Sequence, residues 1–268
     1  MAVRDRAGST RPGDVPSREV TMASDKVRRL RTLLTPPPDW RDWEFTMIVF
    51  GRPISAVFVY LLEGVAFVTP NRLTGLAFAC LLAGSGLLAF SRDHDVLACV
   101  LLFARMVLDD TDGMLARFRG QCSRLGSYLD KVTDAVGFFV LFAAVGVRAA
   151  EATGQGWWVL VSVSGAFSLL LMGYVKHVAR GEEMRARGVP EAPQNESNAG
   201  TFPKPAEFAA KLVARLAVPM ESDLLSFTVV FVLLARFDWA AAFYAVTQGV
   251  AAAVQVVRRG RAVAALDR

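Results

Sequence analysis

Apolar and polar residues alternate along this chain in long blocks rather than residue by residue. Beyond residue 70, most of the chain consists of apolar runs of about 17–25 residues, the length that a helix needs to cross a bilayer. Short polar stretches separate these runs, and Arg236–Asp238 forms a very tight connection between the last two. The pattern predicts an all-α integral membrane protein with six transmembrane helices, near residues 72–91, 95–116, 124–147, 157–178, 222–236 and 238–258.

Residues 39–68 carry a shorter apolar pattern that Arg52, Pro53 and Glu63 interrupt. Trp40 and Trp43 are of the residue type that gathers at membrane–water interfaces. A seventh span is the alternative, but the breaks favour an amphipathic juxtamembrane helix that lies on the cytoplasmic surface. Residues 204–217 have apolar positions at helical spacing and predict a second interfacial helix.

The polar ends of the chain complete the predicted organisation. The first 38 residues are polar and contain Pro36–Pro38, a composition typical of disorder. We therefore expect a disordered cytoplasmic tail (1–38), the juxtamembrane helix (39–68), a six-helix membrane domain (69–258) and a second cytoplasmic tail (259–268).

Lys and Arg gather on one side of the predicted topology. They are frequent in the N-terminal 52 residues, in the 117–124 loop, in the 176–221 segment and after residue 257. The positive-inside rule therefore predicts a multi-pass protein of the cell (inner) membrane, with both termini and the 117–124 loop in the cytoplasm. The net charge of +5 is accounted for by this orientation and by attraction to anionic lipids, so no nucleic-acid partner is expected. The three cysteines provide no disulfide framework.

Two pairs of carboxylates interrupt the apolar pattern. Asp109 and Asp112 are three residues apart, and Asp130 and Asp134 are four apart, so each pair lies on one face of a helix. Ionised carboxylates at membrane depth are costly and mark functional sites. Four of them facing one another would repel unless a cation lay between them. Ligands that are all carboxylate suit a hard divalent ion such as Mg²⁺ or Mn²⁺.

The spacing of these residues is more specific than their chemistry. The segment reads D-x-x-D-G-x-x-A-R-x8-G-x3-D-x3-D and resembles the signature of the CDP-alcohol phosphotransferase family, integral membrane enzymes that make phospholipids and related phosphodiesters. The alternative, that the acids merely cap helix ends, explains neither the paired spacing nor the two glycines. The fixed positions are filled by Asp109, Asp112, Gly113, Ala116, Arg117, Gly126, Asp130 and Asp134.

The resemblance implies a reaction and roles for these residues. Family members transfer a phosphoalcohol from a CDP-alcohol to a second alcohol and release CMP. By resemblance, Asp109, Asp112 and Asp130 bind Mg²⁺ or Mn²⁺, with Asp134 at or beside a second ion. Asp134 is also the residue expected to take the proton of the acceptor hydroxyl.

The small and basic motif residues are expected at the nucleotide. Gly113, Ala116 and Gly126 would allow the CDP-alcohol to approach the backbone, although helix packing is the common role of small residues in membranes. Arg117 would contact the diphosphate or brace the acids. The family also implies a homodimer, and the Gly and Ala content of the third and fourth spans permits close packing between chains.

The acceptor is less well defined by the sequence. Lys176 and Arg180 share a helix face, where they could hold an acceptor phosphate or simply satisfy the positive-inside rule. The segments Arg52–Ser55 and Thr69–Thr74 resemble the inositol-phosphate-using branch. Serine, glycerol 3-phosphate and diacylglycerol remain alternative acceptors, and the donor could be a CDP-diacylglycerol lipid or a soluble CDP-polyol.

Two other classes of protein make different predictions. A cation- or proton-coupled transporter would spread its carboxylates over several helices without a fixed glycine–arginine spacing. An inactive scaffold of the family would lack at least one aspartate. The compact, complete motif favours an enzyme. Near it, Asp110 is expected at a supporting or solvated position, and Arg105, one turn before Asp109, is expected to balance the charge of that residue.

Overall fold

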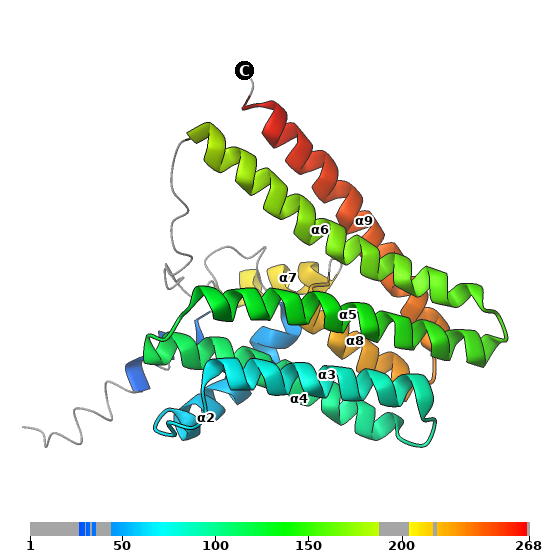
Figure 1. Ribbon diagram of the computed structural model, residues 1–268, viewed down its shortest axis with the longest axis horizontal. Helices are drawn as coiled ribbons and strands as arrows, with labels where there is room; N and C mark the ends of the chain where they lie inside the picture. Colours follow the sequence, from blue (N-terminus) through cyan, green and yellow to red (C-terminus); the bar gives the residue numbers. More distant parts are fainter. Residues whose placement is uncertain are drawn as a thin grey trace, which may run out of the picture.

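The structure is a computed structural model that describes residues 27–29, 31–32, 34–35, 44–187, 204–216 and 219–266. A π-helical turn, η2 (Met47–Gly51), leads into the first of the long helices (Figure 1). The described residues contain no strand, which confirms the all-α class. The helices that follow are α2 (Arg52–Leu62), α3 (Pro70–Phe90), α4 (Asp95–Arg119), α5 (Arg124–Thr153), α6 (Trp157–Arg187), α7 (Pro205–Leu216), α8 (Glu221–Leu233) and α9 (Phe237–Ala264).

Each of the six predicted spans coincides with a helix, but not all six are equally suited to cross a membrane. Helices α3, α5, α6 and α9 are long and apolar enough to do so. Helix α4 carries several charged residues, among them Asp109, Asp112 and Arg117 of the motif, and α8 has only 13 residues. The membrane character is thus confirmed, whereas the count of six crossings stays a prediction.

The segments outside the six helices are only partly described. Of the predicted juxtamembrane segment, residues 39–43 lie outside the described residues, and most of the tail 1–38 does too. The helix itself is present as η2 and α2, and its outer face is apolar, with Val57, Phe58, Tyr60 and Leu61 exposed. Its place at the interface stays a prediction, as does that of α7, which forms where residues 204–217 predicted a helix.

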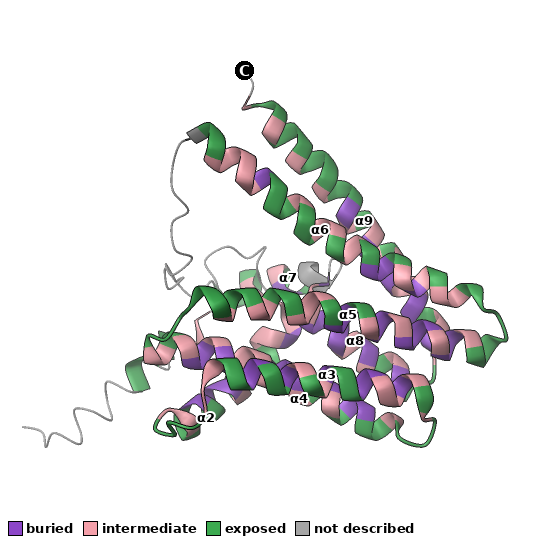
Figure 2. Cartoon of the chain, viewed as in Figure 1, coloured by how far each residue is buried: buried purple, intermediate pink, exposed green. Residues whose placement is uncertain are grey.

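The core lies where α3 packs against α4 and α5, and where α8 and α9 close the other side (Figure 2). Phe142 of α5 stacks on Tyr244 of α9 with ring centroids 4.2 Å apart. The Tyr244 hydroxyl lies 2.5 Å from Thr228 Oγ1 of α8, so this buried phenol has a hydrogen-bond partner.

Small residues of α5 and α6 serve packing inside the protomer. A Cβ added to Gly146 would lie 2.9 Å from the Val159 Cα atom of α6, and one on Gly165 would lie 2.9 Å from the backbone of Tyr244 on α9. Helices α6 and α9 therefore lie side by side at close range (Figure 1). These two glycines are thus already used within the chain and are not free to support a dimer.

The turn between α4 and α5 sets the register of the two halves of the motif. Helix α4 ends at Gly120, whose φ of 65° lies in the left-handed region that favours glycine. Gln121 N then donates to Ala116 O at 2.8 Å. Helix α5 begins after Ser123, whose Oγ accepts a hydrogen bond from Gly126 N at 2.9 Å. A short, doubly capped turn thus leads from Asp112 to Asp130.

Arg119 fixes the connection between α2 and α3. Its guanidinium donates to four backbone carbonyls of that connection: Nε to Glu63 O (3.1 Å), Nη1 to Val68 O (2.5 Å), and Nη2 to Leu62 O (2.6 Å) and Val65 O (3.0 Å). The sequence assigned Arg119 only to the positive side of the membrane. The structure shows that it ties the start of α3 to the end of α4.

The residues before η2 cap the N-terminus of α8. Thr46 donates to Asp223 Oδ1 through its backbone N at 2.8 Å and through Oγ1 at 3.0 Å. Ser222 N donates to Glu44 Oε2 at 3.0 Å and so satisfies an amide of the first turn of α8. These contacts join segments 177 and 178 residues apart in sequence.

This cap predicts a dependence of stability on pH. The pKa of Glu44 is raised from 4.5 to about 7, chiefly by burial and next by the nearby carboxylate of Glu221. Asp223 also raises this pKa, whereas the hydrogen bonds from Ser222 lower it. Arg52 is a further charged neighbour. Because folding raises this pKa, the folded chain binds more protons, and the contribution present below about pH 4.5 is lost as pH rises through 7. We expect Tm to fall between pH 5 and 8 less steeply in Glu44→Gln than in the wild type.

Glutamine at position 44 keeps an oxygen that can accept from Ser222, so the cap itself should survive. A matched control is Glu151→Gln, which removes an exposed acid paired with Arg92. The slope of Tm against pH should be unchanged in that control. An equal slope in Glu44→Gln and the wild type would contradict the prediction.

Candidate active site

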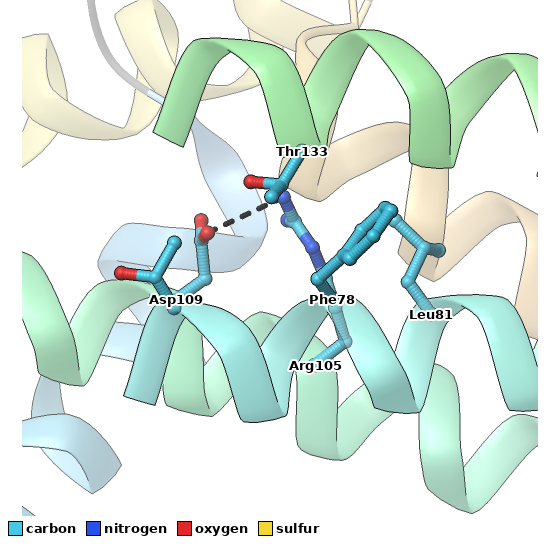
Figure 3. Close-up of a pocket in the computed structure, with 6 residues that line it drawn as sticks. Phe78, Leu81, Arg105, Asp109 and Thr133 are labelled. Carbon is cyan, nitrogen blue, oxygen red and sulfur yellow. Dashed lines mark ion pairs between the residues drawn. The ribbon is translucent and has the colours of Figure 1, made fainter. Parts of the chain in front are cut away.

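The four motif aspartates come from two helices that both pack on α3. Asp109 and Asp112 lie on α4, and Asp130 and Asp134 lie on α5. A small pocket marks the junction of the three helices (Figure 3). Its lining residues are Thr74, Phe78 and Leu81 of α3, Arg105 and Asp109 of α4, and Thr133 of α5.

Arg105 links the two halves of the motif. Its side chain reaches from α4 toward Thr133 of α5, and Figure 3 marks the ion pair with Asp109. The Nη2 atom lies 3.3 Å from Asp109 Oδ1, and the same atom also pairs with Asp134 Oδ1. The guanidinium carbon lies 5.3 Å from the centre of the Phe138 ring. The expected balance of charge with Asp109 is confirmed, and Asp134 is a second partner that the sequence did not indicate.

Asp112 has a different partner. Thr74 Oγ1 of α3 donates to Asp112 Oδ2 at 2.5 Å, and both side chains are buried. The same hydroxyl lies 3.2 Å from Pro70 O, within its own helix. One hydroxyl has one proton to donate, so at any moment Thr74 donates either to the Asp112 carboxylate or to the Pro70 carbonyl. Thr74 is the last residue of the segment that resembled the inositol-phosphate-using branch, and it now has a structural role.

Asp130 and Glu221 complete the charge of the site. Asp130 is partly exposed on α5 and lies close enough to Asp109, Asp112 and Asp134 to interact electrostatically with each. Glu221, the first residue of α8, interacts in the same way with Asp109, Asp134 and Arg105. Glu221 is therefore a fifth carboxylate near the site. No local pattern predicted it, because it lies far along the chain at the start of an apolar run.

Gly113 and Arg117 form a separate arrangement on α4. A Cβ on Gly113 would lie 3.3 Å from Arg117 Nη1, so the arginine folds back over the glycine. Arg117 interacts electrostatically with Asp110, which also lies near Arg52 of α2. Of the alternatives for Arg117, a direct brace on the four motif acids has no support in these contacts. Asp110 is in a supporting position rather than a solvated one, and its Oδ2 is buried without a hydrogen-bond partner.

The remaining small motif residues lie near the turn between α4 and α5. A Cβ on Gly126 would lie 3.1 Å from Ser123 Oγ and 3.2 Å from Asn71 Oδ1, so the side chain of Asn71 on α3 approaches this glycine closely. Ala116 is half-buried one turn before the end of α4. The position of Gly126 is thus tight, and the contact of Ala116 and Gly126 with a nucleotide stays a prediction.

Lys176 and Arg180 lie on α6, away from these contacts. Lys176 is exposed and Arg180 is half-buried. Within the described part of the chain, neither residue forms an ion pair or hydrogen bond with the motif aspartates. Their role toward an acceptor therefore stays a prediction.

The donor set fits a hard divalent ion in its chemistry. It is made of carboxylates from facing helices, which are the ligands that Mg²⁺ and Mn²⁺ prefer. As they stand, no three acidic, His or Cys side chains of the described residues converge closely enough to hold an ion. The reason is visible in their partners, since Thr74 holds Asp112 while Arg105 holds Asp109 and Asp134. Convergence of Asp109 and Asp134 on an ion requires Arg105 to give way, whereas Thr74 contacts only one oxygen of Asp112.

Comparison with known proteins agrees with the motif. A sequence model of the CDP-alcohol phosphatidyltransferase family matches residues 67–250, which include α3 to α8 and the first half of α9. The chain is 30% identical over 148 residues to the phosphatidylinositol phosphate synthase of Corynebacterium glutamicum, covering 54% of this chain and 62% of that protein. It is 37% identical over 67 residues to the archaetidylinositol phosphate synthase of Pyrococcus horikoshii, covering 25% of this chain and 35% of that protein.

The matched parts thus span less than two thirds of either relative. The family model covers more than half of the chain and includes every fixed position of the motif. The chain belongs to the CDP-alcohol phosphatidyltransferase family.

Proposed function

We propose that this protein transfers a phosphoalcohol group from a CDP-alcohol to an alcohol acceptor and releases CMP, in phospholipid or related phosphodiester synthesis. The observation that carries the proposal is the complete set of motif aspartates on α4 and α5, placed beside one pocket with α3. A transporter reading has no comparable support, because these acids belong to one compact motif.

The acids have separate tasks in this proposal. Asp109, Asp112 and Asp130 would hold Mg²⁺ or Mn²⁺, with Asp134 at or beside a second ion. When bound, such ions neutralise the diphosphate and make the reacting phosphorus more electrophilic. Thr74 orients Asp112 through its hydrogen bond, and α3 thereby sets the position of a proposed ligand.

The remaining motif residues would serve the nucleotide and the acceptor. Asp134 lies across from Asp109 and would take the proton of the acceptor hydroxyl during attack. The CDP moiety would approach the backbone at Gly113, Ala116 and Gly126. Arg117, which is exposed near the end of α4 and folds over Gly113, would contact its diphosphate.

The acceptor of this proposal is an inositol phosphate. One relative is named a phosphatidylinositol phosphate synthase and the other an archaetidylinositol phosphate synthase, and the similarity to the Corynebacterium protein extends over 148 residues. The direct test is CMP release by the purified chain, measured with CDP-diacylglycerol and with a soluble CDP-polyol. Each donor would be paired with inositol phosphate, serine, glycerol 3-phosphate or diacylglycerol. CMP release with none of these pairs would refute the proposed activity.

Lys176 and Arg180 provide a sharper test of the acceptor. If they hold an acceptor phosphate, each charge-assisted contact contributes about 1.5–3 kcal/mol. Lys176→Gln or Arg180→Gln should then raise the KM of the acceptor by about 10- to 100-fold and leave the KM of the CDP-alcohol nearly unchanged. Arg185→Gln is a matched control, because Arg185 is an exposed arginine of α6 paired with Glu182. An acceptor KM that stays constant in both variants would leave inositol phosphate without support from these residues.

We further propose that the protein lies in the inner membrane with the motif and both termini facing the cytoplasm, because the basic residues gather on that side. A homodimer with one site per protomer is the assembly that the family resemblance implies. A monomer in native-lipid discs, seen by mass photometry at concentrations where CMP release persists, would contradict that assembly.

A further inference from the structure

A buried arginine occupies carboxylate oxygens of both halves of the motif. Arg105 is 2% exposed, and its Nη2 atom pairs with Oδ1 of Asp109 and with Oδ1 of Asp134. The ring of Phe138 flanks the guanidinium. The guanidinium thus occupies oxygens that the proposed function assigns to a divalent ion or to proton transfer. Figure 3 shows the pair with Asp109.

Arg105 also carries charge opposite to that of its surroundings. Asp109, Asp130, Asp134 and Glu221 all interact with it electrostatically. Within the described part of the chain, Arg105 is the basic side chain that interacts with Asp109, Asp112 and Asp134 alike. A divalent cation in this cluster would be attracted by the acids and repelled by the guanidinium at short range.

We propose that Arg105 is a positioning residue that competes with the divalent ion for Asp109 and Asp134, and so keeps metal binding weak until the CDP-alcohol arrives. This inference rests on the metal-dependent part of the proposed function. The diphosphate of the donor is anionic and can pair with a guanidinium displaced from the carboxylates. Because coupling between ligands is reciprocal, metal and nucleotide then strengthen the binding of each other.

The inference predicts opposite effects of one substitution on binding and on turnover. Arg105→Gln removes the competing charge, so the Kd for Mn²⁺ alone should fall by at least about tenfold. Arg105→Lys keeps the charge, and its Kd for Mn²⁺ should stay within a few-fold of the wild-type value. Both variants lose the guanidinium through which Arg105 links Asp109 of α4 to Asp134 of α5, so CMP release should slow. Electron paramagnetic resonance of Mn²⁺ with the purified full chain, with and without CDP, measures the binding arm directly.

Arg148 offers a matched control. It is 8% exposed, pairs with Asp95 at 2.8 Å, and its guanidinium carbon lies 4.6 Å from the centre of the Phe237 ring. It lies fourteen residues after Asp134 on the same helix, about 21 Å along the axis. Arg148→Gln should lower Tm while leaving the Kd for Mn²⁺ and its response to CDP unchanged.

Several outcomes would overturn the inference. An unchanged or weaker affinity for Mn²⁺ in Arg105→Gln would do so, and so would an equal gain in Arg105→Lys, because charge would then not be the cause. If the Gln variant does not fold, Arg105→Met keeps the contact with Phe138 and takes its place. Failure of both to fold with Mn²⁺ present would make Arg105 a structural residue.

The inference and the proposed function can fail separately. Tighter Mn²⁺ binding in Arg105→Gln, with no CMP release by the wild type from any donor and acceptor pair, would refute the activity and retain the role of Arg105. CMP release by the wild type with no change in Mn²⁺ affinity in Arg105→Gln would retain the activity and refute the role of Arg105. No Mn²⁺ binding by the wild type or the variants would overturn the inference.

Discussion

Replacing any one of Asp109, Asp112 and Asp130 by Asn is expected to lower CMP release by more than about 100-fold. An asparagine keeps the size of the side chain but removes a negative charge from the ligand set. The ion would then be held less tightly and in a different place, and the remaining carboxylates would face one another with less compensation. The measurement is CMP release at saturating donor and acceptor, over a range of Mg²⁺ and Mn²⁺ concentrations.

Asp110→Asn is the control for this series, because it changes an acid of the same helix whose main charged neighbours are Arg52 and Arg117. Its turnover should stay within a few-fold of the wild type, even if Tm changes. Activity of the wild type should vanish in chelator and return with Mg²⁺ or Mn²⁺. Full CMP release in excess EDTA would refute the metal-dependent mechanism.

The residues of the motif were predictable because their chemistry is encoded locally. The spacing from Asp109 to Asp134 places two pairs of acids on two helices, and Gly120 with Ser123 supplies a turn that brings these helices together in a fixed register. Apolar runs of bilayer length likewise placed the helices correctly. Such signals depend on neighbours within one or two helical turns, which a single sequence displays.

The partners of the acids were less accessible for the opposite reason. Thr74 contacts Asp112 across 38 residues, and Arg105 contacts Asp134 across 29. For Arg105, the sequence predicted only the pairing with Asp109, one turn away. The place of Glu221 near the site and the capping of α8 by Glu44 depend on contacts between distant segments. The local pattern at either position does not predict them. Apolar length alone could not predict whether α4 and α8 cross the membrane. Helix α4 carries charged residues, and α8 has only 13 residues.

Asp134→Asn is the substitution that separates proton transfer from metal binding. As a general base, Asp134 would contribute about 10²–10⁴-fold to the rate, so kcat should fall by that factor. Binding of Mn²⁺ and of CDP should change little, because Asp109, Asp112 and Asp130 remain. The asparagine keeps an oxygen that can accept from Arg105, so the link between α4 and α5 should survive. Lys131→Gln, an exposed change on the same helix, is the control for general effects on α5.

The two roles of Asp134 leave different patterns in this experiment. A loss of Mn²⁺ affinity as large as the loss of kcat would identify Asp134 as a ligand first, and turnover near the wild-type rate would remove it from the mechanism. The contact with Arg105 sharpens the distinction. Replacing Asp134 by Asn removes one of the two charges that pair with Arg105, so its remaining ion pair is with Asp109. A ligand role then predicts that Arg105→Gln restores part of the Mn²⁺ affinity in the double variant. A base role predicts that no substitution at Arg105 restores kcat, because the group that accepts the proton is gone.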